Sequence, residues 1–337
     1  VTGSYVNDAL GSNQRYLTYQ AEVSTPVWLP GQGRATVAAG QAEVSSLDAE
    51  GEALHLSLAR QVLDAASQAA LAENARTAAG RRLQAAQVLA ADLNRRFRVG
   101  EAAQSDALAA DADVANAAVT LADAAAQLAA AQATLAALTG STSVPSLSGG
   151  AVAVPGLDAL RQVHPRLVAA RRLVDAAQSS LRLTRLDTRD SPEIGVQGIH
   201  EKQGAATPYN TRFGVVVRFP FATQARNAPR IAAAEAQVTA AEVQQVQAER
   251  QVLAELQSAQ GALEAARQGS AAATRAAGSL TIRRGQIERA WRAGEMPLIE
   301  VLRANAVAFD AELVRDKSRT VLQASQQRLQ IAAGLLP

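Results

Sequence analysis

The sequence predicts a mainly helical protein with a small β part, built from a strand-strand-helix-helix unit that occurs twice. Two long windows, residues 31–144 and 230–296, contain no proline and are rich in Ala, Leu, Gln, Glu and Arg, which favour helices. Each window follows a short segment of alternating residues, as expected of strands. One turn sequence, RRFRVGEAAQSDAL from Arg95, returns 194 residues later as RAWRAGEMPLIEVL from Arg289. A duplicated unit is therefore expected.

The composition excludes several classes of function. The 337 residues carry 33 basic and 31 acidic side chains, and this balance argues against a nucleic-acid partner. There is no cysteine, which excludes thiolate metal sites and disulfides. His55, His164 and His200 stand far apart and are interpreted as ordinary polar residues, so no metal site is predicted. No apolar run approaches the ~20 residues of a transmembrane helix.

Strand pairs are expected within residues 1–30 and 193–221. In the second pair, Phe213, Val215, Val217 and Phe219 alternate with Gly214, Val216 and Arg218, which is typical of a sheet with two unlike faces. In the first pair, Tyr19 and Val23 fall on one face, and the other face holds Gln20, Glu22 and Ser24. Eight of the eleven aromatic residues lie in these two stretches, so the helices have a core of small side chains.

Helices are expected over residues 35–139, with a turn at Gly100 that divides a run of about 65 residues from a second helix beginning near Gln104. Apolar residues recur three and four apart, as on an amphipathic helix. Gly140 is suited to a C-terminal cap. Residues 141–156 form a connector rich in Ser, Pro and Gly, followed by a helix over 157–186. The last helices are expected over 230–334, with a turn at Gly294.

A constant offset of 194 aligns the two copies without a gap. It places Tyr19 on Phe213, Pro26 on Pro220, and Gly140 on Gly334. The expected organisation is a first repeat over 1–140, the connector, and a second repeat over 157–337. Because the second strand pair is preceded by a helix, the repeat also predicts about 50 residues, including a helix, before Val1.

Helix lengths suggest a tube wall. One helix of about 65 residues leads away from the strands, and two pieces of about 36 and 30 residues lead back.

The strands themselves fit a bilayer: Tyr16 to Trp28 and Tyr209 to Phe221 each span 12 residues, ~40 Å of strand or ~30 Å of height when tilted. The alternative is a small soluble sheet that caps a helical bundle. In lipid, open sheet edges would require several chains to share one barrel.

These features together resemble the TolC-type outer-membrane efflux ducts: two strands, a long helix, an aromatic-x-x-Gly turn and an acidic residue six after the glycine, all duplicated. The resemblance covers nearly the whole chain. It implies a homotrimer with a twelve-stranded barrel in outer-membrane lipid and a helical tunnel in the periplasm. It also implies docking to a periplasmic adaptor protein and an inner-membrane pump. The segments around Pro26 and Pro220 most resemble the heavy-metal, CzcC-like branch that serves cobalt–zinc–cadmium exporters.

The resemblance also implies roles for particular residues. The adaptor-docking tips are Phe97, Val99, Gly100 and Glu101 with Trp291, Ala293, Gly294 and Glu295. The membrane girdle comprises Tyr16, Tyr19, Trp28, Tyr209, Phe213, Phe219 and Phe221. Asp106 and Glu300 match acidic gate positions, with Arg98, Arg292 and Arg303 beside them in the lumen or at the gate. Alternatively, both acids simply complement the positive end of a helix dipole. Arg303 stands where a second acid can occur and is spaced to pair with Glu300.

Nothing in the sequence resembles a catalytic triad, a phosphate loop or a paired-carboxylate site, so neither an enzyme nor a cofactor is predicted. The competing class is a soluble coiled-coil structural or tethering protein. That class would account for the helices but not for the duplicated strands with aromatic residues at both ends.

Overall fold

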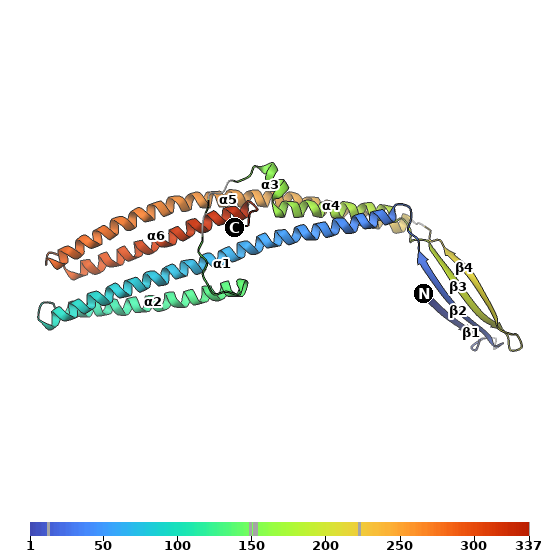
Figure 1. Cartoon of the computed structure of the whole chain (residues 1–337), viewed down its shortest axis with the longest axis horizontal. Helices are drawn as coiled ribbons and strands as arrows, with labels where there is room; N and C mark the ends of the chain where they lie inside the picture. Colours follow the sequence, from blue (N-terminus) through green and yellow to red (C-terminus); the bar gives the residue numbers. More distant parts are fainter. Residues whose placement is uncertain (12–13, 148–149, 151–153, 222–223, 337) are drawn as a thin grey trace. The chain divides into compact units, whose positions relative to one another are not determined.

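The computed structural model describes residues 1–11, 14–147, 150, 154–221 and 224–336 and confirms the duplicated strand-strand-helix-helix order (Figure 1). The elements are β1 (Thr2–Asn7), β2 (Tyr16–Pro26), α1 (Gln32–Arg98), α2 (Gln104–Thr139), α3 (Leu157–Val163), α4 (Pro165–Leu186), β3 (Glu193–Gln203), β4 (Asn210–Arg218), α5 (Gln224–Arg292) and α6 (Leu298–Ala332). The chain forms two compact units, residues 1–50 with 168–248 and residues 51–167 with 249–337. Part of the expected connector, 148–149 and 151–153, lies outside the described residues.

The two long helices match the proline-free windows. α1 has 67 residues and α5 has 69, about 100 Å each at 1.5 Å per residue. Their buried positions are mainly alanine and leucine, among them Ala66, Ala69 and Leu63 on α1. Small side chains let neighbouring helices approach closely, which accounts for a core with few aromatic rings.

Two helix boundaries differ from the prediction. The helix expected over 157–186 is broken at His164, because Pro165 disfavours helical backbone in the residue before it; His164 adopts φ −69° and ψ 120°. α5 begins at Gln224 rather than at 230, and Pro229 lies inside it. Because Pro229 lies close to the start of α5, it removes only the hydrogen bond to the carbonyl of Ala225. The helix tolerates this loss.

The four strands form one antiparallel sheet in the order β1-β2-β3-β4. Tyr5 faces Tyr19 in the β1–β2 register, Tyr19 faces His200, and Gly198 faces Phe213. The strands are shorter than expected: β2 ends at Pro26 and β4 at Arg218, so Trp28, Phe219 and Phe221 lie just beyond them. β1 and β4 are the edges.

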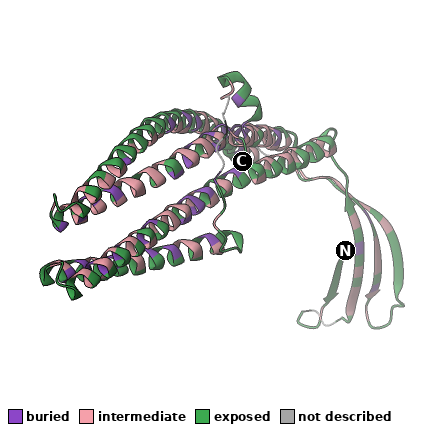
Figure 2. Ribbon diagram, turned by 60° about the vertical axis from the view of Figure 1, so that its left-hand side comes forward, coloured by how far each residue is buried: buried purple, intermediate pink, exposed green. Residues whose placement is uncertain are grey.

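The two faces of the sheet are unlike, as the alternation predicted. One face exposes Tyr5, Tyr19, Val23, Ile194, Val196, Phe213, Val215 and Val217. Figure 2 shows that exposed and intermediate residues make up most of the sheet. On the other face, Glu22 and Glu201 are buried, and each pairs with an arginine of β4: Arg218 lies 3.1 Å from Glu22, and Arg212 lies 2.6 Å from Glu201. Polar and charged groups therefore line one face, while an apolar surface covers the other.

A close backbone approach between β2 and β3 depends on Gly195. A Cβ atom at this position would lie 2.7 Å from both the Ser24 Cβ and the Val23 carbonyl oxygen. Gly214, on the same face of β4, has more room: its nearest neighbour would be the Gln197 side-chain amide at 3.5 Å.

We expect Gly195→Ala to destabilise the sheet by about 1–3 kcal/mol, because the added methyl group must push backbone aside. Gly214→Ala is the matched control and should change stability little. Thermal unfolding followed by circular dichroism measures both. Equal midpoints for the two variants would contradict this account of the β2–β3 contact.

Candidate functional site: helical turns and two-faced sheet

The two turns between long helices have the same geometry. Gly100 and Gly294 both have φ +80°, a conformation that glycine adopts without strain. In each turn the residue after the glycine donates its N–H to a carbonyl five residues back, Glu101 to Arg96 at 2.8 Å and Glu295 to Ala290 at 2.9 Å. This is the Schellman pattern, which closes a helix end. Both turns are therefore built by local sequence.

Apolar and charged groups are exposed at these turns. Val99 is 71% exposed and Phe97 40%, and Ala293 and the two glutamates, Glu101 and Glu295, are exposed as well. Trp291 is half-buried against the core of Leu93, Ala110, Leu298 and Val301. The tips thus present small apolar surface flanked by carboxylates.

Asp106 and Glu300 occupy the same position, the third residue of α2 and of α6. Glu300 accepts a hydrogen bond from Arg303 at 2.7 Å, which confirms the predicted pairing. Asp106 makes no side-chain hydrogen bond or ion pair with the described part of the chain. The two acids are equivalent in backbone geometry but not in electrostatic environment, since only Glu300 has a neighbouring cation.

The arginines at the tips bond within their own helices. Arg98 donates to the carbonyl of Asn94 at 3.2 Å, and Arg292 pairs with Glu288. A different arginine joins the two hairpins: the Arg96 guanidinium lies 5.0 Å from the ring centre of Trp291 and 3.0 Å from Asp92. Sequence reasoning missed this contact, because Arg96 has no charged equivalent in the second repeat, where Ala290 stands.

Charged residues further along the wall also join α1 to α6. Asp316 of α6 accepts hydrogen bonds from Arg81 at 2.9 Å and from Arg315 at 3.0 Å. Burial alone would raise the pKa of Asp316, but the hydrogen bonds and positive charges of these arginines outweigh it and hold the pKa below its ordinary value. The carboxylate is therefore ionised near neutral pH and cross-links the helices.

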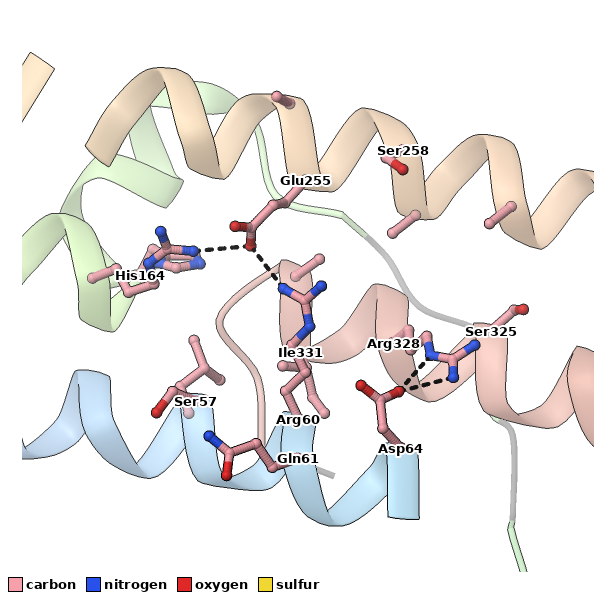
Figure 3. Close-up of a pocket in the computed structure, with 16 residues that line it drawn as sticks. Ser57, Arg60, Gln61, Asp64, His164, Glu255, Ser258, Ser325, Arg328 and Ile331 are labelled. Atoms are coloured by element: carbon pink, nitrogen blue, oxygen red, sulfur yellow. Dashed lines mark hydrogen bonds and ion pairs between the residues drawn. The ribbon is translucent and has the colours of Figure 1, made fainter. Parts of the chain in front are cut away.

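A cavity of about 690 Å³ lies between α1, α5 and the end of α6 (Figure 3). Glu255 of α5 lies 2.9 Å from Arg166 and 3.5 Å from Arg60, and Arg328 pairs with Asp64 at 2.8 Å. His164 is buried at its edge, and its Nδ1 finds no hydrogen-bond partner among the residues that the structure describes. Among the described residues no three His, Cys, Asp or Glu side chains group closely enough to hold a metal ion.

The aromatic residues predicted to form a girdle lie at both ends of the sheet. Tyr19 and Phe213 lie on its apolar face, Tyr209 just precedes β4, and Trp28, Phe219 and Phe221 follow β2 and β4. Tyr16 is an exception: alternation along β2 puts it on the face of Gln20 and Glu22, so it does not contribute to the apolar surface. His200, which was interpreted as an ordinary polar residue, stacks on Tyr209 at 4.5 Å.

A protein-family profile described as "Outer membrane efflux protein" matches residues 3–141, the first repeat. The first repeat is therefore similar to the outer membrane efflux proteins, and this agrees with the resemblance seen in the sequence. This description agrees with an outer-membrane channel and describes a protein that is not an enzyme. A comparison with curated protein sequences gave no match.

Solved structures share the fold over both repeats. CusC, described for its transmembrane channel formation, aligns with a TM-score of 0.78 at 18% identity, covering 99% of this chain and 82% of CusC. VceC, an outer membrane protein of Vibrio cholerae, gives 0.73 at 17% identity, with 99% and 84% covered. The open-state MtrE outer membrane channel of Neisseria gonorrhoeae gives 0.75 at 18%, with 99% and 79% covered. The fold similarity therefore extends over the second repeat, which the family profile does not cover.

One described helix, α2, is long and apolar enough to pass a test for a membrane span by length and composition, contrary to the expectation from the sequence. Its apolar character comes mostly from alanine, and Ala107, Ala110, Ala117, Leu128 and Leu135 are buried. A single helix of this kind is weak evidence for a span.

Replacing Arg96 should loosen the two turns relative to each other. The chain has no cysteine, so Val99→Cys and Ala293→Cys supply two spin-label sites without background. We expect Arg96→Gln to broaden the distance distribution between the labels, because a cation–π contact of ~0.5–2 kcal/mol is lost. Arg95→Gln is the control, since it removes only contacts within α1, an exposed pair with Asp92 and a hydrogen bond to the carbonyl of Ala91. Identical broadening in both variants would contradict a specific role for Arg96.

Stability should fall on acidification because of His164. Burial is the main cause that lowers its pKa, helped by the nearby Arg166, so the folded state binds the proton less readily than the unfolded state. Stability from this residue is full above the ordinary pKa of about 6.5 and declines as the pH drops below it. Thermal midpoints from pH 8 to 5 should flatten in His164→Asn, whereas His55→Asn, at an exposed site, should keep the wild-type slope.

Proposed function

We propose that this protein is an outer membrane efflux protein and serves as the passive exit duct of a tripartite efflux system. In that role it conducts substrate from an adaptor and pump through the periplasm and the outer membrane. The observation that carries the proposal is the four-stranded sheet with one exposed apolar face and two open edges. Unpaired backbone groups at β1 and β4 would be costly in lipid, and pairing β1 of one copy with β4 of the next removes them.

Closure of that kind defines the assembly. A homotrimer contributes twelve strands, with the apolar faces of Val215 and Phe213 toward lipid and the Glu22 and Glu201 ion pairs toward the lumen. The fold shared with CusC, VceC and MtrE supports this assembly. A soluble coiled-coil tether, the second candidate, gives no reason for a sheet whose exposed face is apolar.

The two turns are proposed as the adaptor-docking tips, at the opposite end of the long helices from the strands. Val99, Phe97 and Ala293 supply apolar contact surface, and the αL glycines fix its shape. Asp106 and Glu300 are proposed as gate acids that form rings under three-fold symmetry, with Arg98 and Arg292 beside them. The helix-dipole alternative remains for both acids, because each lies in a first helical turn.

The cargo is proposed to be a heavy-metal cation, as in the CzcC-like branch. Acidic rings attract cations, and a duct that releases its cargo needs no high-affinity ligands. The described residues include no cluster of metal ligands, which is compatible with transit rather than storage.

Gly100→Leu should abolish efflux-dependent tolerance, because it strains the αL backbone and adds bulk at the docking tip. Gly140→Leu is a close control: Gly140 has φ +73° and open space around it, like Gly100, but it lies at the other end of α2. Bacterial growth in the presence of an exported toxic metal gives the readout, with the trimer checked by its mass in detergent. Unchanged tolerance in Gly100→Leu would count against docking at this turn, and a stable detergent-free monomer against the duct itself.

Asp106→Asn should reduce cation preference in planar-bilayer recordings more than Glu300→Gln, since Arg303 already neutralises Glu300. The reversal potential under a salt gradient measures the preference. If Asp106→Asn left the potential unmoved, the gate role of Asp106 would be wrong even with the duct intact.

A further inference from the structure

A row of rings crosses β1, β2 and β3 on the apolar face, near the two hairpins, and reaches Tyr209 just before β4. Tyr5 and Tyr19 lie 5.0 Å apart, Tyr19 and His200 6.4 Å, and His200 stacks on Tyr209 at 4.5 Å with the rings 6° from parallel. His200 Nδ1 also lies 2.8 Å from the Thr211 hydroxyl, which fixes its ring plane. The row ends at Lys202, whose ammonium lies 5.6 Å from the centre of the Tyr209 ring.

Lys202 is unusual in two ways: it lies on the apolar face of the sheet, and it has no paired carboxylate among the described residues. Only one other lysine, Lys317, occurs in the chain, and the remaining basic residues are arginines. Lys202 faces Leu17 across the β2–β3 ladder, on the apolar side. In the part of the chain that the structure describes, no carboxylate pairs with it. The adjacent Glu201 points to the other face and binds Arg212, and Asp8 accepts backbone N–H groups from Gln14 and Tyr16.

Lys202 lies near the end of β3, at the rim of the apolar face. From Ile194 to Lys202 is eight residues, ~26 Å along the strand or ~20 Å of height when tilted ~40°, which lies within the ~25 Å apolar band of a membrane barrel and puts Lys202 near its edge. A lysine at such a rim extends its ammonium toward the headgroups while its methylene chain stays on apolar surface. An ammonium with no protein counter-ion at this depth is complementary to an anion supplied by the lipid.

We infer that Lys202, with the Tyr209 ring beside it, is a binding site for the phosphate of an outer-leaflet lipid headgroup. The inference rests on the proposed function, since it requires the apolar face to lie in lipid with the hairpins outward. The ammonium pairs with the phosphate oxygens as a point charge, and the row of rings packs against the upper acyl chains. The partner is a phosphorylated lipid rather than free phosphate, because only a lipid delivers both groups.

Native mass spectrometry of the detergent-purified protein tests the site. The probes are an acylated glucosamine disaccharide carrying two phosphate monoesters and the same lipid with its phosphates removed. We expect the wild type to retain the phosphorylated lipid preferentially and Lys202→Gln to retain about five-fold less of it, equivalent to ~1 kcal/mol. Lys317→Gln, the other lysine of the chain, should behave as wild type, and Lys202→Arg should keep most of the binding.

The outcomes separate the two proposals. Equal retention by wild type and Lys202→Gln, or no preference for the phosphorylated lipid, would overturn the lipid site while the trimer mass in the same spectrum still supported the duct. A monomer that carries no detergent would overturn both. Loss of binding in Lys202→Gln with an intact trimer supports the site.

Discussion

The unsatisfied edges of the sheet constrain everything else in this protein. β1 and β4 each have one side without a hydrogen-bonded neighbour, and the face between them exposes large apolar side chains. Neither feature is stable in water, and open edges are costly in lipid. Closure with further copies resolves both. The near-equal lengths of α1 and α5, and of α2 and α6, follow from the duplication of the unit.

Most of the fold could be predicted from the sequence because it depends on local rules. Helices without proline extend until a glycine allows a left-handed turn, and Gly100, Gly140, Gly294 and Gly334 all show positive φ. The alternation of apolar and polar residues along β2 and β4 is also a local rule, and it predicted which residues lie on each face of the sheet. The errors concern proline, which acts through its neighbours: it broke the helix at His164 but was tolerated at Pro229 near the start of α5.

The site was less predictable because its contacts join distant segments. The turns and the Glu300–Arg303 pair are local and were predicted. The Arg96–Trp291 contact links residues 195 positions apart and has no counterpart under the repeat, so no pattern in the sequence indicates it. The ring row through His200 likewise exists only once four strands are in register. Repeat symmetry predicts what the two halves share, and it is uninformative where they differ.

The ion pairs on the polar face show how far the halves have diverged since duplication. Under the 194-residue offset, Arg212 and Arg218 correspond to Thr18 and Ser24, and Glu201 corresponds to Asn7. The arginines exist only in the second copy, yet Arg218 reaches Glu22 of the first. Two tandem copies of the first half would bury Glu22 with no cation near it. The halves are therefore no longer interchangeable: Glu22 of the first half takes its counter-ion from Arg218, which only the second half carries.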